Sequence, residues 1–346
     1  MTAPAQAEGR KRILTGIRPT GALHLGHYAG ALENWVRLQD EYDCYFLIAD
    51  YQVSDHADDI ARVREAVWEV ALDWLAVGLD PQRSHFVIES LVPEHAELTT
   101  WLSWFLPVSM LERNPTLRAE MEAIEHPDDP NAERKAVPVA FYNYPVMQVA
   151  NILLPRAHLV PTGDDQLPHI ELTRETARRF NHRFKPVFPE PGGLLGRAPR
   201  LVGVDGNAKM SKGKNNAIYL KDDAATVTRK VMGMYTPRMS RTDAGDPEAT
   251  PAFMYHDVFN ADGAEVEDLK ARYRLGNVGD VEVKQKLARA LNVFLDPVRE
   301  RRAHYEKDMG YVREALARGS AEERAIGSET MAMVRDALDL DYLAKH

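Results

Sequence analysis

The first ninety residues alternate between short apolar runs and longer stretches of helical periodicity, and this alternation constrains the fold more than any other feature. Strand-like runs lie at 13–15, 45–49 and 86–88. Between them, apolar residues recur every three or four positions, as on an amphipathic helix: Leu25, Ala29, Leu32 and Val36, and then Ile60, Val63, Val67, Ala71 and Trp74. Strands that alternate with helices predict a doubly wound parallel α/β sheet with helices on both faces.

The remainder of the chain divides by composition. The polar start, residues 1–11, is interpreted as a flexible tail. The stretch at about 112–136 is highly charged and broken by prolines, so we expect an exposed helical hairpin or a mobile insertion there. Beyond about residue 220 the helical period dominates. At 346 residues, the chain is long enough for a main sheet domain at 12–220 and a helical domain at 221–346.

Charge and cysteine content exclude several classes of protein. With 52 acidic and 43 basic residues, the formal charge of −9 argues against indiscriminate nucleic-acid binding over the whole surface. No apolar run approaches the roughly 20 residues of a membrane-spanning helix, and no secretory signal is recognisable. Cys44 is the single cysteine, so an intrachain disulfide is excluded, and its apolar neighbours favour core packing. We expect a soluble protein of the reducing cytoplasm.

The segment LTGIRPTGALHLGH at 14–27 joins the first expected strand to the first expected helix. It is neither a Walker A loop nor a GxGxxG fingerprint. His24 and His27 are three residues apart at the expected helix N-terminus, where backbone N–H groups and the helix dipole favour an anion. Gly26 removes a side chain where a nucleotide has to come close. A metal pair is disfavoured because no third ligand accompanies the histidines, but a purely structural role remains an alternative.

A second candidate segment, AKMSKGKNN at 208–216, forms a cationic loop suited to polyphosphate, although alone it could be a solvated loop. HxGH followed about 185 residues later by KMSK resembles the two defining motifs of class I aminoacyl-tRNA synthetases. The opening GIRPTGALHLGHYAGAL and the block NYPVMQVANILLPRAHLVPTGDDQLPHIELTRETARRFN at 143–181 are similar to the tryptophanyl-tRNA synthetases in particular.

This resemblance implies a Rossmann-like catalytic domain at 12–220, with a KMSK loop at about 205–216, and a tRNA-recognising, anticodon-binding helical domain at 221–346. It implies a cytoplasmic, homodimeric ligase that activates L-tryptophan with ATP to tryptophanyl-adenylate and transfers it to tRNA(Trp). Mg²⁺ would arrive with ATP rather than occupy a metal site of the protein. The basic stretches 174–185 and 299–307 are candidate tRNA contacts, although solvated helix faces are the simpler interpretation.

The resemblance also implies roles for individual residues. The catalytic groups would be His24, His27, Lys209 and Lys212. ATP would contact Gly16, Arg18, Pro19, Thr20, Gly26, His27, Gly163, Asp164, Asp165, Leu201, Lys209, Met210, Ser211, Lys212 and Gly213. Tryptophan would lie among Leu14, Gln52, Tyr144, Gln148, Asn151, Val160, Thr162 and Gln166. Of these, Tyr144 and Gln166 would hold the α-amino group.

Two pocket positions depart from the commoner bacterial pattern. Asn151 stands where an aspartate usually accepts the indole N–H, and Gln148 replaces a methionine one helical turn earlier. Both side chains carry a carbonyl oxygen, so either could accept that hydrogen bond as a neutral contact about 1 kcal/mol weaker. We expect indole recognition to move at least partly to Gln148 and the pocket to tolerate ring-modified tryptophans. Gly213, in place of the usual serine, would loosen the KMSK loop and reduce the rate.

Three other functions compete with this interpretation. A tyrosyl-tRNA synthetase shares the architecture, but that family typically offers a tyrosine and an aspartate where Leu14 and Asn151 stand. An accessory protein that keeps tryptophan and ATP binding is motivated by the altered pocket, whereas the intact HLGH and KMSK motifs favour retained catalysis. A small-molecule adenylyltransferase with an HxGH site would be expected to lack both KMSK and the helical domain.

Overall fold

A computed structural model describes residues 9–125, 136–163, 166–195, 201–206, 210, 216–240 and 243–342. Its strands are β1 (Arg12–Ile17), β2 (Asp43–Ile48), β3 (His85–Ile88), β4 (Leu159–Thr162) and β5 (Gly192–Leu195). Its α-helices are α1 (Leu25–His27), α2 (Glu33–Leu38), α3 (Ile60–Val77), α4 (Glu94–Ser103), α5 (Val108–Glu112), α6 (Pro115–Glu125), α7 (Val139–Leu153), α8 (Leu167–Arg183), α9 (Ala224–Met232), α10 (Pro251–Phe259), α11 (Gly263–Arg274), α12 (Asp280–Glu306) and α13 (Met309–Ala337).

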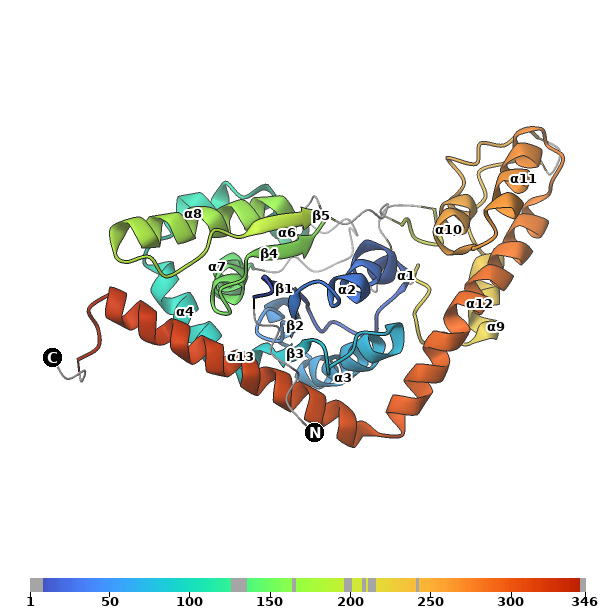
Figure 1. Cartoon of the computed structure of the whole chain (residues 1–346). Coiled ribbons are helices and arrows are strands. Elements are labelled where there is room, and N and C mark those ends of the chain that lie inside the picture. The colour runs from blue at the N-terminus through green and yellow to red at the C-terminus, as the bar shows by residue number, and fades with distance from the viewer. Residues whose placement is uncertain are drawn as a thin grey trace.

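The five strands form one parallel sheet in the order β3-β2-β1-β4-β5. The chain adds strands outward from β1 to β3, then crosses back to place β4 on the other side of β1 (Figure 1). Such a reversal leaves a crevice at the carboxyl ends of the strands on either side of it, which is where doubly wound folds bind ligands. The predicted doubly wound parallel α/β fold is confirmed. The expected strand runs at 13–15 and 86–88 lie within β1 and β3, and the run at 45–49 coincides with β2 except for its last residue.

The two faces of the sheet carry separate apolar clusters because parallel strands covered by helices are buried on both sides. Cys44 is fully buried in β2, as its apolar neighbours predicted, and burial raises the pKa of its thiol to about 12. In α3 the expected stripe is buried except at Ile60, which is 55% exposed. Ile60 is the first residue of α3, and the buried part of the stripe begins one turn later, at Val63.

The first crossover helix is less regular than its spacing predicted. Between α1 and α2 the chain forms a π-helical turn at Tyr28–Leu32. Single π turns inside helices occur frequently at functional sites, because the extra residue re-aims side chains. Leu25, Ala29 and Leu32 are nevertheless buried, as the apolar stripe predicted.

The charged stretch expected to be an insertion contains α6, while residues 126–135 lie outside the described part of the chain. Further on, α9 to α12 form a helical arm beside the sheet, and α13 turns back beneath it (Figure 1). Gly319 of α13 lies directly on the backbone of Phe86 in β3. The segment after residue 220 therefore contributes both to the arm and to the packing of the sheet. Within the described residues, no helix is long and apolar enough to cross a membrane.

Candidate active site

A cavity of about 390 Å³ opens beside the carboxyl ends of β1 and β4, where the sheet order reverses. Its apolar walls include Leu14, Leu47 and Val160, and its polar groups include side chains from α1, α6, α7 and β4 and from the loops after β1, β2 and β4. It is lined by all the residues that the sequence assigned to the tryptophan pocket: Leu14, Gln52, Tyr144, Gln148, Asn151, Val160, Thr162 and Gln166. The fold thus brings together side chains from five separate segments.

The two histidines of HLGH lie at the start of α1, as expected. His24 is the N-cap residue and is buried, and its ring centroid lies 3.8 Å from that of His27. The backbone N–H of His24 donates to His27 Nδ1 at 3.2 Å, which leaves Nε2 of a neutral His27 to carry the proton. His27 lines the cavity, whereas His24 does not. Across the described residues, no group of three His, Cys, Asp or Glu side chains could hold a metal ion.

Residues next to the KMSK motif contact the HLGH segment in the folded chain. The backbone N–H of Leu25 donates to the carbonyl of Ile218, and that of Leu220 donates to Leu23. Met210 is buried, with its sulfur 3.5 Å from the position that a Cβ on Gly26 would occupy. Two segments far apart in sequence therefore meet at one helix start. The other expected residues of these loops lie outside the described part of the chain: Asp164, Asp165, Lys209, Ser211, Lys212 and Gly213.

The remaining residues of the expected ATP site divide into two groups. Gly16, Arg18 and Gly163 line the cavity. A Cβ on Gly16 would lie 2.6 Å from the carbonyl oxygen of Leu47, so β1 can pair closely with β2 only because this residue is glycine. The guanidinium of Arg18 forms an ion pair with Asp55. Five of the described residues expected to contact ATP do not line the cavity: Pro19, Thr20, Gly26, Leu201 and Met210.

One end of the cavity carries a negative charge that sequence reasoning missed. The hydroxyl of Tyr144 donates to Glu120 Oε2 at 2.6 Å, and both residues line the cavity. Burial raises the pKa of the Tyr144 hydroxyl, and the Glu120 carboxylate raises it further. Glu120 belongs to α6, within the stretch expected to be an exposed insertion. The charged pattern of this stretch gave no signal that Glu120 would line the cavity.

At another wall of the cavity, three polar side chains form a network, and its central member was also missed. Glu89 follows β3 and is fully buried. Its Oε1 accepts hydrogen bonds from Asn151 Nδ2 at 2.7 Å and from Gln52 Nε2 at 3.1 Å. Burial raises the pKa of Glu89, and the nearby His95 and these donors oppose that shift. The sequence shows that Glu89 follows an apolar run, but it does not show that the side-chain amides of Asn151 and Gln52 would bind it.

Comparison with known proteins now identifies the family. The model for class I tRNA synthetases of the tryptophan and tyrosine type matches residues 6–296. The chain is 47% identical to the tryptophan–tRNA ligase of Treponema pallidum, over 95% of this chain and 97% of that protein. It belongs to the tryptophan–tRNA ligase family. The corresponding ligase of Streptococcus pneumoniae serotype 4 is 45% identical, with 95% of this chain and 98% of that protein aligned.

Solved structures agree with this assignment. A tryptophanyl-tRNA synthetase from Campylobacter jejuni, crystallised with ADP and tryptophan, superposes with a TM-score of 0.83 at 28% identity. The superposition covers 95% of this chain and all of that one. A tyrosyl-tRNA synthetase from Archaeoglobus fulgidus shares only the fold, at 23% identity and a TM-score of 0.66. The chain is thus a ligase of the tryptophan-specific kind, and the tyrosine alternative loses its support.

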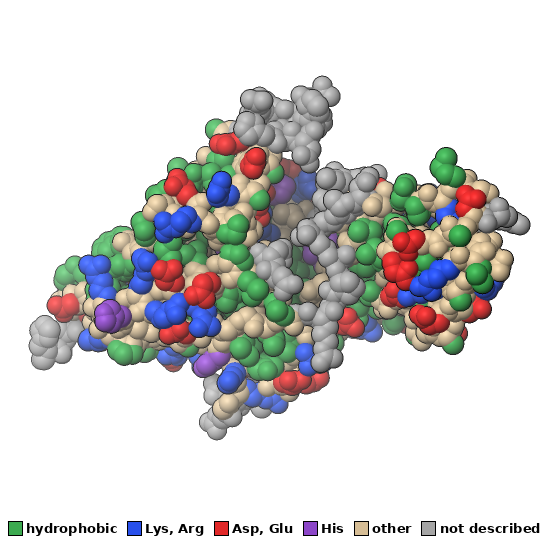
Figure 2. Space-filling view, turned by 90° about the horizontal axis from the view of Figure 1, so that it is seen from above, with side chains coloured by type: hydrophobic (Ala, Val, Ile, Leu, Met, Phe, Trp, Pro, Cys, Tyr) green, Lys and Arg blue, Asp and Glu red, His purple; other side chains and the backbone are tan. Residues whose placement is uncertain are grey.

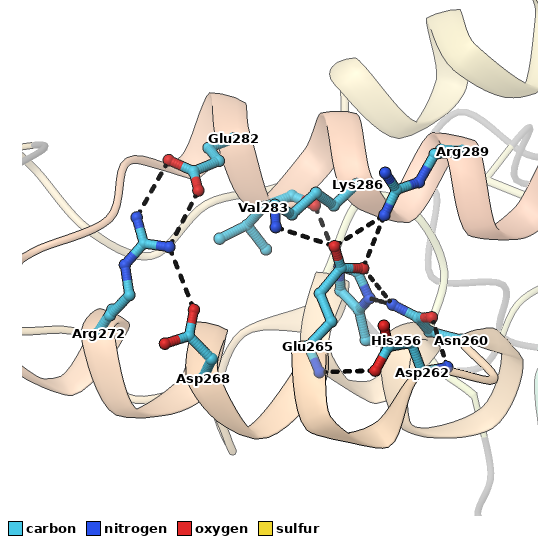
Figure 3. Close-up of polar contacts among 10 residues, drawn as sticks. All are labelled: His256, Asn260, Asp262, Glu265, Asp268, Arg272, Glu282, Val283, Lys286 and Arg289. Atoms are coloured by element: carbon cyan, nitrogen blue, oxygen red, sulfur yellow. Dashed lines mark hydrogen bonds and ion pairs between the residues drawn. The ribbon is translucent and has the colours of Figure 1, made fainter.

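Several basic residues of the stretch 299–307 and of the arm form polar contacts within the chain. In the stretch 299–307, Arg301 donates to the carbonyl of Ala76, and Arg302 is buried against α3. In the arm, Arg289 and Lys286 of α12 both bind Glu265 of α11, whose pKa Lys286 lowers to about 2 (Figure 3). These side chains join helices to one another.

The face with the cavity is hollowed between the sheet and the arm (Figure 2).

Proposed function

We propose that this chain activates L-tryptophan with ATP in the cavity and transfers the tryptophanyl group to tRNA(Trp). The observation that carries the proposal is the cavity itself, because every residue assigned to the amino-acid pocket from sequence lines it, next to His27. Apolar walls suit an indole ring, and a few polar groups at the ends would orient it. The ligand complex of the Campylobacter relative contains tryptophan and ADP, which supports the same two sites in this chain.

The chemistry proceeds in two steps. The tryptophan carboxylate attacks the α-phosphorus of ATP, and pyrophosphate leaves as tryptophanyl-adenylate forms. A ribose hydroxyl at the 3′ end of the tRNA then attacks the aminoacyl carbonyl carbon, and AMP leaves. In the first step charge builds up on phosphoryl oxygens, so the protein acts mainly by positioning and by electrostatic stabilisation. We assign that stabilisation to His24, His27, Lys209 and Lys212, with Mg²⁺ carried by the nucleotide.

The ends of the cavity would fix the orientation of tryptophan. Tyr144 and Gln166 contact the α-amino group in this proposal, and the carboxylate of Glu120 favours its protonated form. The indole N–H faces Asn151 and Gln148, which both carry acceptor oxygens. If Gln148 shares that contact, Gln148→Ala raises the KM for tryptophan severalfold. An unchanged KM would remove Gln148 from indole recognition and leave Asn151 as the acceptor.

The partners beyond the small substrates are also proposals. The helical region at 221–346 would recognise tRNA, and the protein would act as a homodimer in the cytoplasm. Within this region the ammonium of Lys284 donates to the carbonyl of Met234 at 2.5 Å. Sedimentation equilibrium at micromolar concentration would test the dimer, since a single species of the monomer mass, 39.0 kDa, contradicts it.

Two activity measurements on one preparation test the proposal. The first is ATP–pyrophosphate exchange dependent on tryptophan, with tyrosine in parallel. The second is transfer of radiolabelled tryptophan to purified tRNA. Exchange and charging with tryptophan alone are the expected results. Exchange without charging would favour an accessory protein that has kept adenylation, and tyrosine-dependent exchange or no exchange would contradict the proposal outright.

A further inference from the structure

Glu89 occupies an unusual place for a carboxylate, because it is fully buried directly behind the wall of the cavity. It begins the short turn Glu89–Leu91 after β3, and it does not itself line the cavity. Its Oε2 accepts the backbone N–H of Tyr51 at 3.0 Å. In return, Asp50 accepts the backbone N–H of Ser90 at 2.9 Å. These reciprocal contacts cross-link the ends of β2 and β3, so the position of Glu89 is tightly defined.

The other carboxylate oxygen of Glu89 determines the orientation of the side-chain amides of Asn151 and Gln52. Oε1 accepts from Asn151 Nδ2 at 2.7 Å and from Gln52 Nε2 at 3.1 Å. An ionised carboxylate can only accept hydrogen bonds, so each amide has to present its NH₂ group to Glu89. Each carbonyl oxygen then points elsewhere. The orientation of an amide is usually ambiguous, but here the acid resolves it.

Asn151 Oδ1 is the polar atom that this arrangement leaves without a partner. Asn151 is 2% exposed, and Oδ1 has no hydrogen-bond partner among the residues that the structure describes. A buried acceptor without a partner is costly, and sites that contain one favour a ligand that supplies a donor. Asn151 lines the cavity on α7, next to Gln148 one turn earlier. The wall therefore offers an acceptor to whatever ring occupies the cavity.

A buried imidazole helps to hold Glu89 in its charged form. His95 of α4 has no exposed surface, and its Nε2 lies 3.4 Å from Glu323 of α13. Burial alone would lower the pKa of His95, but the carboxylates of Glu323 and Glu89 together raise it. The charged imidazole in turn opposes the effect of burial on Glu89. An acid that keeps its charge remains an acceptor, which the orientation of Asn151 requires.

We propose that Glu89 is a positioning residue for substrate selection: it fixes the Asn151 amide so that the carbonyl oxygen accepts the indole N–H of tryptophan. This inference rests on the proposed function and adds a specificity element to it. Glu89 acts through Asn151 and does not touch the substrate. Because the contact lies at the ring rather than at the reacting carboxylate, its loss raises KM and leaves kcat nearly unchanged.

The test compares tryptophan with L-β-(benzothiophen-3-yl)alanine, in which sulfur replaces the indole N–H. The readout is the ratio of kcat/KM for the two amino acids in ATP–pyrophosphate exchange. Glu89→Gln retains size but lets residue 89 either donate or accept, so the Asn151 amide can flip. We expect the ratio to fall about tenfold, mainly through the KM for tryptophan. Glu97→Gln is the matched control, since that carboxylate of α4 binds Arg335 away from the cavity.

A rescue variant separates positioning from a merely structural role. In Glu89→Gln/Asn151→Asp the acid and the amide exchange places. The amide now at position 89 can donate to the carboxylate now at position 151, and the second oxygen of that carboxylate can accept the indole N–H. We expect this double variant to regain the preference for tryptophan. If Glu89→Gln does not fold, as judged by thermal melting, the double variant alone decides: a retained preference supports the proposal and a lost one overturns it.

The remaining outcomes are also decisive. An unchanged ratio in folded Glu89→Gln, or an equal loss of kcat/KM for both amino acids, would overturn the assignment of Glu89. Neither result would affect the proposed function, because the wild-type protein would still exchange with tryptophan. Absence of tryptophan-dependent exchange in the wild type would instead be a failure of the proposed function itself.

Discussion

Gly26 shows how a single missing side chain supports the site. The sequence suggested that this glycine leaves room for a nucleotide, whereas the structure fills the neighbouring space with protein atoms. A Cβ on Gly26 would lie 3.0 Å from His24 Nδ1 and 3.5 Å from the sulfur of Met210. The glycine therefore lets the imidazole of His24 and the buried methionine of the KMSK segment approach the same turn.

Gly26→Ala would shift the His24 ring by a few tenths of an ångström. We expect kcat for tryptophan-dependent exchange to fall roughly tenfold, because the proposed function assigns transition-state stabilisation to the His24 ring and small displacements of such a group are costly. The melting temperature should change little, since the flexible ends of two side chains can give way. Gly263→Ala is the control, because a Cβ at that position meets no atom within 4 Å. Equal kcat values for the two variants would show that the position of the His24 ring does not affect the exchange reaction.

At the scale of elements, α13 is packed unusually closely against the edge of the sheet. A Cβ on Gly319 would lie 2.5 Å from the backbone nitrogen of Phe86 and closer still to its carbonyl oxygen. Backbone atoms cannot move aside as a side chain can. The helix can therefore lie on β3 only because residue 319 is glycine, and it holds Glu323 beneath the active site as a result.

Gly319→Ala tests this packing. Although alanine is the better helix former by about 1 kcal/mol, the clash should separate α13 from β3 and lower the free energy of unfolding by about 3 kcal/mol. Gly310→Ala in the same helix meets only Asp308 Oδ1 at 3.4 Å, so it should not lower the free energy of unfolding. Urea unfolding measures both variants. Identical midpoints for the two would contradict the close packing.

A histidine at the same edge predicts a pH dependence of stability. His85 Nδ1 lies 2.7 Å from Glu322 of α13, and Nε2 lies 3.0 Å from Asp43 of β2. Burial lowers the pKa of His85, but the two carboxylates outweigh it and raise the pKa from 6.5 to about 9. A raised folded-state pKa stabilises the protein fully below about pH 6.5, and this contribution disappears as the pH rises through 9. It amounts to about 3 kcal/mol.

The free energy of unfolding of the wild type, measured with urea, should therefore be lower at pH 9 than at pH 6.5. His85→Gln should be less stable than the wild type at the lower pH and should lose less between the two values. A wild-type curve that is as flat as that of the variant would mean that the two carboxylates do not bind a charged imidazole.

For the whole molecule, ion pairs of the buried Arg302 side chain join the helical arm to the segment that begins the active site. Arg302 of α12 forms ion pairs with Asp73 and with Glu69, both of α3. The second oxygen of Asp73 accepts the backbone N–H of Leu23 at 2.7 Å, immediately before the HLGH histidines. Burial raises the pKa of Asp73 to about 6, and the Arg302 charge opposes that shift. The arm, α3 and the start of α1 are therefore linked through two side chains.

Removing the Arg302 guanidinium leaves the Asp73 carboxylate buried without a compensating charge. Arg302→Met should lower the free energy of unfolding by about 3 kcal/mol. Arg302→Met/Asp73→Asn removes the stranded charge and retains an acceptor for Leu23, so it should recover most of that loss. Guanidinium unfolding monitored by circular dichroism measures both. A double variant no more stable than the single one would show that lost packing, not the stranded charge, causes the effect.

The sequence by itself predicted the parallel sheet, because local periodicity indicates strands and helices, and its motifs carry the resemblance that predicted the family and the tryptophan-pocket residues that line the cavity. Tertiary structure decided the rest. Nothing in the local pattern of Glu89, Glu120 or Gly319 indicates their partners, because each is defined by a contact with a residue distant in the chain. Contacts of that kind exist only once the chain has folded, and they are what orient the acceptors and cover the cavity.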